Sequence, residues 1–378
     1  MPFAVAPLPI AAALTGWLSA CGAPDAPRDL NTLQDSTATV DILENSATCS
    51  SCITVERVVA LGDTAGPGYI SWSRYATLDG AGNYWVGQQQ ESVVKVWDAE
   101  GSFLRQVGRR GDGPMEFQRP APVRTDSEGR GHIVDLAIGR ETVVNPDFSF
   151  HSDRSIYPGY SHLAVPLGED GRYLLNMGTT RAGLVGMPLH IVDAPDMLHS
   201  FDRMEGLDAP GFAPRVLAVD RRRRIYSARS DDYLIQVWSE SGRRILGLSG
   251  PRLNEREASR EPWSPDNPPR NRMYAMQVDE QRLWVISSAR KDDWQDHMEL
   301  RRMPNGRVAY APIDDDFREI FQMRIDLIDL ASGSFIATRR HDSLLEAFIG
   351  DGLVIETVEN EQYYPQMVVW RLGFDAMR

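Results

Sequence analysis

The sequence is poor in three features: long helical patterns, excess positive charge and catalytic motifs. No segment carries a long, well-capped amphipathic stripe, so a mainly helical fold is not expected. The formal net charge is −13. This acidic balance argues against a nucleic-acid partner and against electrostatic docking on anionic lipid, because both need a basic surface.

The missing motifs also argue against several enzyme classes. The chain contains no H-E-x-x-H, no G-x-S-x-G and no calcium-loop pattern. The acidic run Asp314 to Asp316 is better explained as solvated surface than as a calcium site. His132 and Asp135 lie three apart on one expected strand and so face opposite sides, which favours a solvated or hydrogen-bonded histidine over a metal ligand. We therefore predict no catalytic residue, no bound metal and no cofactor. The histidines are scattered, at His132, His151, His162, His190, His199, His297 and His341.

The first 20 residues have the pattern of a secretory leader. Phe3 to Ala20 is uncharged, is interrupted by proline and glycine, and ends in small residues, which suits a signal peptide better than a membrane span. The ending "LSAC" resembles the bacterial lipobox, in which the chain is cut before a cysteine that then carries lipid, although no Lys or Arg precedes the apolar run. We expect lipidation at Cys21 and anchoring to the outer membrane. Ordinary secretion is the alternative.

The chain after the leader divides into a spacer and a folded body. Small and polar residues without periodicity dominate up to residue 47, which is typical of a tether. We predict a signal peptide over 1–20, a lipid-anchored flexible tether over 21–47 and a folded domain over 48–378. At the start of that domain, Cys49 and Cys52 form a C-x-x-C in an exported chain, without a βαβ pattern or a second ligand pair. A structural disulfide is favoured over a zinc site or thiol redox chemistry.

The sequence pattern predicts that the folded domain is all-β. Its apolar runs are short, rich in β-branched and aromatic residues, and separated by turn residues. One phrase, a strand followed by an acidic turn and a second strand, recurs six times. This phrase is one hairpin, and the strands that follow it supply a second hairpin, so that each unit makes a four-stranded sheet. Six such sheets stacked in a ring give a six-bladed β-propeller. The turn aspartates of the six units are Asp79, Asp126, Asp170, Asp220, Asp279 and Asp351.

The two ends of the domain are expected to close this ring. The last unit shows three clear strands, and the run Ile53–Leu61 has no unit of its own. We therefore predict that Ile53–Leu61 supplies the outer strand of the last blade, because an open ring would expose two sheet faces. The long segment Ala289–Gln322 is expected to be an insert in the fifth unit.

One stretch, Val93 to Asp135, resembles the NHL repeat of six-bladed propellers. The family pattern is a strand, D-x-x-G, a strand ending in Gly, and a linker ending in E-F-x-x-P. The resemblance implies that "GRRGDGPMEFQRP" joins two blades, with Phe117 filling the gap between sheets, and not that it binds phosphate. It also places the chain near bacterial six-bladed propeller lipoproteins of unassigned role. The matching residues are Asp98, Gly101, Gly108, Gly111, Gly113, Pro114, Glu116, Phe117 and Pro120.

Propellers bind ligands at the mouth of the central channel, on loops that join the blades. Polar residues just before or on the innermost strands are therefore the candidate ligand-binding residues, although they could equally solvate the channel. These are Arg74, Arg124, His162, Arg215 and Tyr274.

Three functions remain open. The preferred one is a non-enzymatic cell-envelope lipoprotein that binds a protein, peptide or glycan, touches the membrane only through its lipid anchor, and has no nucleic-acid partner. The second is a metal-dependent hydrolase or lyase, similar to propeller lactonases, acting at the central channel. The third is a redox protein that uses Cys49 and Cys52.

Overall fold

The computed structural model describes residues 39–42, 49–71, 73–157, 159–181, 183–204, 214–254, 263–302, 306, 308–313, 316–360 and 363–376. The predicted signal peptide, the lipidation site Cys21 and the acidic residues Asp314 and Asp315 lie outside these described residues. Within the described part of the chain, no helix is both long enough and apolar enough to cross a membrane.

The body consists of six sheets, each built on four antiparallel strands, which we number as blades 1 to 6. The strands of each blade are given from the channel outwards. Blade 1 contains β3 (Ala76–Leu78), β4 (Tyr84–Gln88), β5 (Val93–Trp97) and β6 (Phe103–Val107); blade 2 contains β9 (Pro120–Thr125), β10 (Gly131–Asp135), β11 (Arg140–Val144) and β12 (Phe150–Ser155); blade 3 contains β13 (Leu163–Pro166), β14 (Arg172–Asn176), β15 (Leu189–Asp193) and β16 (Asp196–Phe201). Blade 4 contains β17 (Arg215–Val219), β18 (Ile225–Arg229), β19 (Leu234–Trp238) and β20 (Arg244–Ser249); blade 5 contains β21 (Met273–Asp279), β22 (Arg282–Arg290), β25 (Phe321–Asp329) and β26 (Ser334–His341); blade 6 contains β27 (Ala347–Gly350), β28 (Leu353–Glu359), β29 (Pro365–Phe374) and β2 (Ile53–Leu61).

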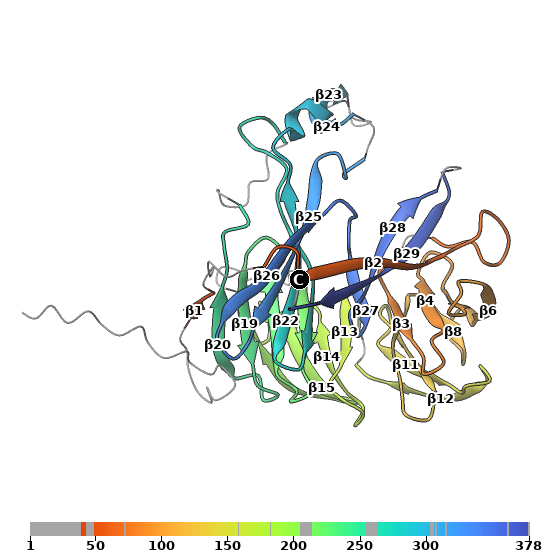
Figure 1. Cartoon of the computed structure of the whole chain (residues 1–378). Coiled ribbons are helices and arrows are strands. Elements are labelled where there is room, and N and C mark those ends of the chain that lie inside the picture. The colour runs from red at the N-terminus through yellow and green to blue at the C-terminus, as the bar shows by residue number, and fades with distance from the viewer. Residues whose placement is uncertain are drawn as a thin grey trace, which may run out of the picture.

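The inner strands form a closed ring, which confirms the predicted six-bladed β-propeller. Each inner strand contacts the inner strand of the next blade, and β27 contacts β3. The closing strand is the predicted one: β2 pairs antiparallel with β29 from Ile53, opposite Phe374, to Leu61, opposite Met367. Figure 1 shows the C-terminus beside the start of β2. The two ends of the folded domain therefore share one blade.

The hydrophobic cores lie between neighbouring blades. At the junction of blades 1 and 2, Trp85 and Val96 pack with Ile133 and Val144 around Phe117. Corresponding clusters fill the other five junctions. The sequence pattern explains this arrangement, because the middle strands are apolar on both faces and each sheet must bury both against its neighbours.

The linker between blades 1 and 2 is architectural, as predicted. The Phe117 side chain is 0% exposed between the two sheets. Gly108 has φ +79°, and a Cβ built there would lie 2.3 Å from the Phe117 ring. Glycine is therefore needed at position 108 both for its backbone conformation and for the close approach of the ring.

The predicted turn aspartates lie between the inner and second strands of the blades, except Asp279, which is the last residue of the inner strand β21. In blades 1, 2 and 4 they share one pattern. One carboxylate oxygen accepts the backbone N–H groups two and four residues later. The other oxygen contacts the polar group of the aromatic side chain six residues later: Asp79 lies 3.1 Å from Trp85 Nε1, Asp126 lies 3.2 Å from His132 Nε2 and Asp220 lies 3.4 Å from the Tyr226 hydroxyl. Each aspartate thus fixes both its hairpin turn and an aromatic side chain.

The segment before the propeller is partly built into it. Thr39–Asp41, inside the stretch expected to be a flexible tether over 21–47, forms strand β1, which pairs in parallel with β20 at the outer edge of blade 4. Its β-branched residues suit a strand, and the Thr39 hydroxyl accepts a hydrogen bond from Arg244 at 3.1 Å. Residues 39–41 therefore pair with a blade of the propeller, within the stretch that was expected to be a tether.

The predicted disulfide between Cys49 and Cys52 is present. Cys49 makes a parallel bridge to Ala337 on the outer strand of blade 5, and the Cys52 carbonyl accepts a hydrogen bond from the Asp375 backbone at 2.9 Å. The disulfide thus joins the start of the closing strand to blades 5 and 6.

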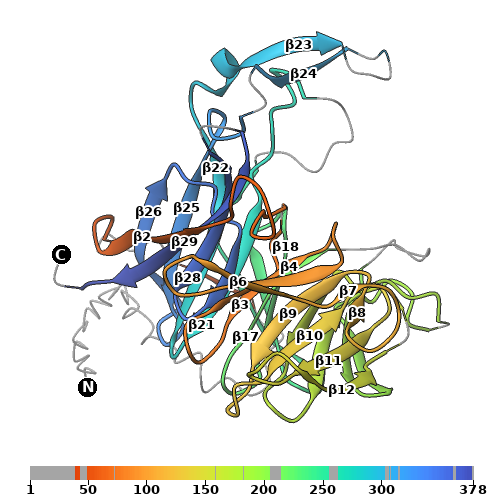
Figure 2. The ribbon, with the colours of Figure 1, turned by 90° about the vertical axis from the view of Figure 1, so that its right-hand side faces the viewer.

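The predicted insert of blade 5 is also present. Between β22 and β25 the chain forms a 3-10 helix, η2 (Trp294–His297), and a hairpin of β23 (Met298–Arg302) and β24 (Val308–Pro312). Figure 2 shows this hairpin standing away from the blades. In the described residues, Arg301 contacts the Glu299 carboxylate at 3.0 Å and donates a hydrogen bond to the Pro312 carbonyl at 2.8 Å.

Candidate functional site

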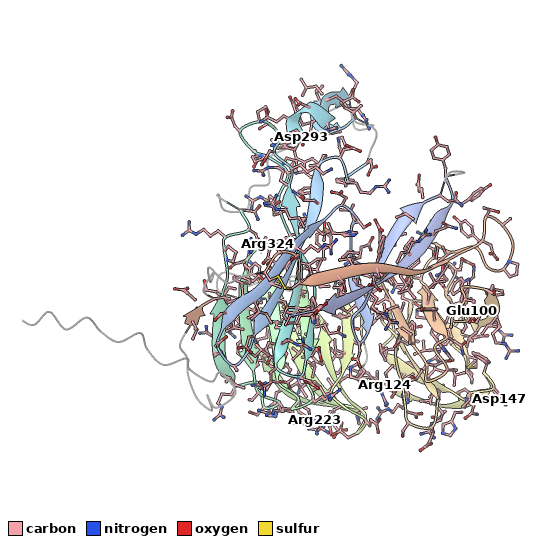
Figure 3. The ribbon with its side chains drawn as sticks, viewed as in Figure 1. Glu100, Arg124, Asp147, Arg223, Asp293 and Arg324 are labelled. Carbon is pink, nitrogen blue, oxygen red and sulfur yellow. A yellow bond between two sulfur atoms is a disulfide. The ribbon has the colours of Figure 1, made fainter. Side chains whose placement is uncertain are left out.

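The N-terminal ends of the inner strands meet at one end of the channel, which we call the mouth. The insert projects from the same end, because Met273 at the start of β21 pairs with Ser287 near the end of β22. Figure 3 shows Asp293 of the insert at one end of the molecule, and Arg124 and Arg223 towards the other. The residues that directly precede or begin the inner strands therefore determine the chemistry of the mouth.

A cavity of about 340 Å³ opens at the mouth. Its lining comes from blades 1, 2, 3 and 6, and every lining residue carries a polar group, although about half of the cavity surface is apolar. The lining residues are Ser73, Arg74, Tyr75, Gln89, Arg119, His162 and Glu346. A cavity of this size accommodates a small molecule or one unit of a longer chain.

The last residues of the second strands hold the linkers that carry these side chains. In blade 2, the fully buried Asp135 carboxylate accepts the backbone N–H groups of Gln118 at 2.6 Å and Arg119 at 3.1 Å. In blade 1, the buried Gln88 side chain accepts the Ser71 N–H at 2.6 Å. These bonds fix the linker backbone independently of any ligand, so the mouth is largely preformed.

Arg119 is positioned by its side chain as well as by its backbone. One terminal nitrogen donates to the Tyr160 hydroxyl at 2.7 Å, and the other donates to Gln89 Oε1 at 2.9 Å. The guanidinium also stacks over the Tyr160 ring at 5.0 Å. Three contacts thus hold this cation at the cavity wall.

The Tyr75 side chain of blade 1 forms a hydrogen bond with blade 3 at the channel mouth. Its hydroxyl donates to the His162 carbonyl at 2.9 Å, and its own carbonyl accepts the Gly87 N–H at 2.8 Å. Burial raises the pKa of the Tyr75 phenol. The phenol therefore stays protonated at neutral pH and continues to donate this hydrogen bond.

Arg74 is exposed and influences several titratable groups around the mouth. Burial lowers the pKa of His162, and the charges of Arg74 and Arg119 lower it further, so the imidazole is neutral at pH 7. Burial raises the pKa of the Glu346 carboxyl, and Arg74 offsets part of that rise. The pKa of Tyr274 is likewise raised by burial, with Arg272, Arg74 and Glu346 all acting on it. These side chains thus form one electrostatic unit.

Three of the five predicted ligand-binding residues belong to this unit. Arg74 and His162 line the cavity, and Tyr274 lies close enough to interact with Arg74 and Glu346. The Tyr274 side chain is 38% exposed, so it remains available at the mouth. The ligand-binding role of these residues remains a proposal.

The structure places the other two predicted residues outside the cavity. Arg124 lies towards the opposite end of the channel, with its guanidinium 3.3 Å from His132 Nδ1. Arg215 is only 7% exposed, and its Nε donates to the Asp202 carboxylate at 2.5 Å. Neither side chain is among the residues that line the cavity.

Sequence reasoning did not single out Arg119 or Glu346. Arg119 directly precedes β9, and Glu346 directly precedes β27. The rule that selected Arg74 and His162, a polar residue just before an inner strand, applies equally to these two positions. Applied to every unit, it would have found them.

His132 is hydrogen-bonded, as predicted, and lies away from the mouth. It contacts Glu141 at 2.7 Å and Asp126 at 3.2 Å. Glu141 also accepts hydrogen bonds from Arg154 at 2.6 Å and from the Tyr173 hydroxyl of blade 3. This buried network joins blades 2 and 3. Across the described residues, no group of three or more His, Cys, Asp or Glu side chains is arranged to hold a metal ion.

No family model and no curated protein sequence matches this chain. Solved structures do match it. One is a candidate exported protein from Bacteroides fragilis, with 13% identity and a TM-score of 0.55, covering 89% of this chain and 99% of that one. Another is a member of the DUF4221 family from Bacteroides vulgatus, with 10% identity and a TM-score of 0.53, covering 85% and 98%. A streptogramin B lyase matches with 10% identity and a TM-score of 0.44, covering 85% and 98%. The likeness to the two Bacteroides structures shows a shared fold and, at these identities, nothing further.

Proposed function

We propose that this chain is an exported, lipid-anchored protein of the bacterial cell envelope, related to NHL-type propellers, that binds a protein, peptide or glycan at the channel mouth without transforming it. The leader-like first 20 residues and the lipobox-like ending at Cys21 support export and anchoring. A structural neighbour named as a candidate exported protein is consistent with that placement.

The observation that carries the binding role is the preformed cavity at the mouth. Four blades supply its polar lining, and buried hydrogen bonds from Asp135 and Gln88 hold two of the linkers that carry it. Preformed polar groups around a concave site reduce the ordering cost of binding.

A metal-dependent hydrolase or lyase would need a different set of residues lining the cavity. A metal-dependent reaction at the axis needs several carboxylate, Asn or His donors aimed at one point. The cavity instead combines two guanidinium groups and one carboxyl with a histidine. This donor set suits recognition of a charged ligand better than metal chemistry.

Site-specific photo-crosslinking in cells tests the binding role. A benzophenone amino acid replaces Tyr274 at the mouth or, as a matched control, Phe150 on the outer strand of blade 2, which is also exposed, at 42%. We expect a discrete cross-linked product at position 274 and none at position 150. Equal labelling at both positions, or no product at position 274, would contradict the proposal. One stoichiometric divalent ion in the purified protein would favour the enzyme instead.

A further inference from the structure

The charge at the mouth is opposite to that of the whole protein. The chain has a formal net charge of −13, yet the ionisable lining of the cavity consists of Arg74, Arg119 and His162 against the single carboxyl of Glu346. Arg272 adds a further exposed cation beside Tyr274. A local reversal of charge in a concave site concentrates anions there.

The two arginines differ in how they are held. Arg119 is fixed by Tyr160, Gln89 and the Asp135 contact to its backbone. Arg74 comes from the neighbouring linker and is exposed to solvent. Because both arginines line the same cavity, a planar oxyanion bound there can accept hydrogen bonds from two different linkers.

The chemistry of the donors favours a carboxylate. Two guanidinium groups against a single carboxyl make the cavity a site for an anion. A carboxylate is the singly charged, planar oxyanion that arginine binds through paired hydrogen bonds.

We propose that the cavity at the mouth binds the carboxylate group of its ligand between Arg74 and Arg119. The inference rests on the proposed function and adds the chemical class of the ligand. The carboxylate can belong to the C-terminus of a peptide or to an acidic sugar, and both place the same group between the two arginines.

Acetate, the simplest probe, provides the test. Binding to the purified chain is followed by saturation-transfer NMR in wild type, Arg74→Gln, Arg119→Gln and the control Arg105→Gln, an exposed arginine on the outer strand of blade 1. We expect saturable binding with a Kd of roughly 1–10 mM, as fits so small a ligand. Each mouth variant should weaken binding at least about tenfold, and Arg105→Gln should not change it. Arg74→Lys should recover part of the affinity, because it keeps the charge and loses the planar pair of donors.

Three results overturn this inference. They are an absence of saturable acetate binding, equal binding by wild type and both mouth variants, and inorganic phosphate that binds more tightly than acetate. Unchanged circular dichroism and melting temperature in the variants ensure that lost binding reports on the site and not on unfolding.

Two further pairs of probes identify the source of the carboxylate. N-acetylalanine is compared with its amide, and glucuronate with glucose. The acid that binds more tightly than acetate identifies the source, and a neutral partner that binds as well as its acid contradicts the proposal. Cross-linking at position 274 that persists in both mouth variants would reject the carboxylate while keeping the proposed function. Acetate binding without any cross-linked product at position 274 would support the carboxylate site and contradict the proposed binding of a protein, peptide or glycan.

Discussion

Ile53, the first residue of the closing strand, lies directly opposite Phe374, near the end of the chain. Ile53 is 0% exposed and packs in the core between blades 5 and 6. The stability of the whole ring therefore depends on a contact between residues at opposite ends of the domain.

Shortening the side chain of Ile53 should weaken this closure. Ile53→Ala should lower the free energy of unfolding by about 3 kcal/mol, because it leaves a cavity in a packed core. Val58→Ala, in the same strand but 39% exposed, should change it by less than about 0.5 kcal/mol. Urea unfolding followed by tryptophan fluorescence measures both. Equal effects would mean that the buried Ile53 side chain does not contribute to closure.

Removing the disulfide should affect stability and not ligand binding. The loop closed by Cys49 and Cys52 is very short, so replacing both residues with serine should cost about 2 kcal/mol. Wild type in reducing agent should unfold at the same urea concentration as the double variant. A loss of electron-transfer activity with no change in stability would instead support a redox role for the pair.

Alanine at Gly108 should destabilise the linker between blades 1 and 2. Gly66 is a matched control, because its φ of +84° is similar to that of Gly108 but no neighbouring atom lies within 4 Å of the place that a Cβ would occupy. Gly66→Ala should cost about 1 kcal/mol for its left-handed backbone alone. Gly108→Ala should cost roughly 1–3 kcal/mol more, since its Cβ meets the Phe117 ring. Thermal unfolding compares the two variants, and equal losses would show that the ring moves aside freely.

The buried Glu141 should give the protein a specific sensitivity to acid. Burial alone would raise the pKa of Glu141, but hydrogen bonds from His132, Tyr173 and Arg154 outweigh it and lower the pKa to about 2 from the ordinary 4.5. A lowered pKa stabilises the fold fully above about pH 4.5, and this contribution is lost as the pH falls towards 2.

Glu141→Gln isolates this contribution, because it removes the titration and keeps the side-chain shape. The stability advantage of wild type over Glu141→Gln should shrink by roughly 3 kcal/mol between pH 5 and pH 2. Urea unfolding at a series of pH values measures the difference. A constant difference across this range would show that the carboxylate is not stabilised by its three donors.

Much of the fold follows from local patterns. The aspartate turns, such as the one at Asp79, and the alternation of short apolar strands identify each hairpin from a few neighbouring residues. The closing role of Ile53–Leu61 also follows from the sequence, because an incomplete last unit leaves one strand unpaired. By contrast, the strand Thr39–Asp41 was not predicted, since its partner β20 lies far away in the chain.

Which side chains are available at the mouth depends on the tertiary structure. Arg74 and Arg215 look alike in the sequence, because both stand at the entrance to an inner strand. Only the fold brings Asp202 to Arg215 and buries the pair, while Arg74 stays exposed beside Glu346. Local composition predicts which residues reach the channel, but their charge partners come from distant segments, and those partners determine which side chains remain available to a ligand.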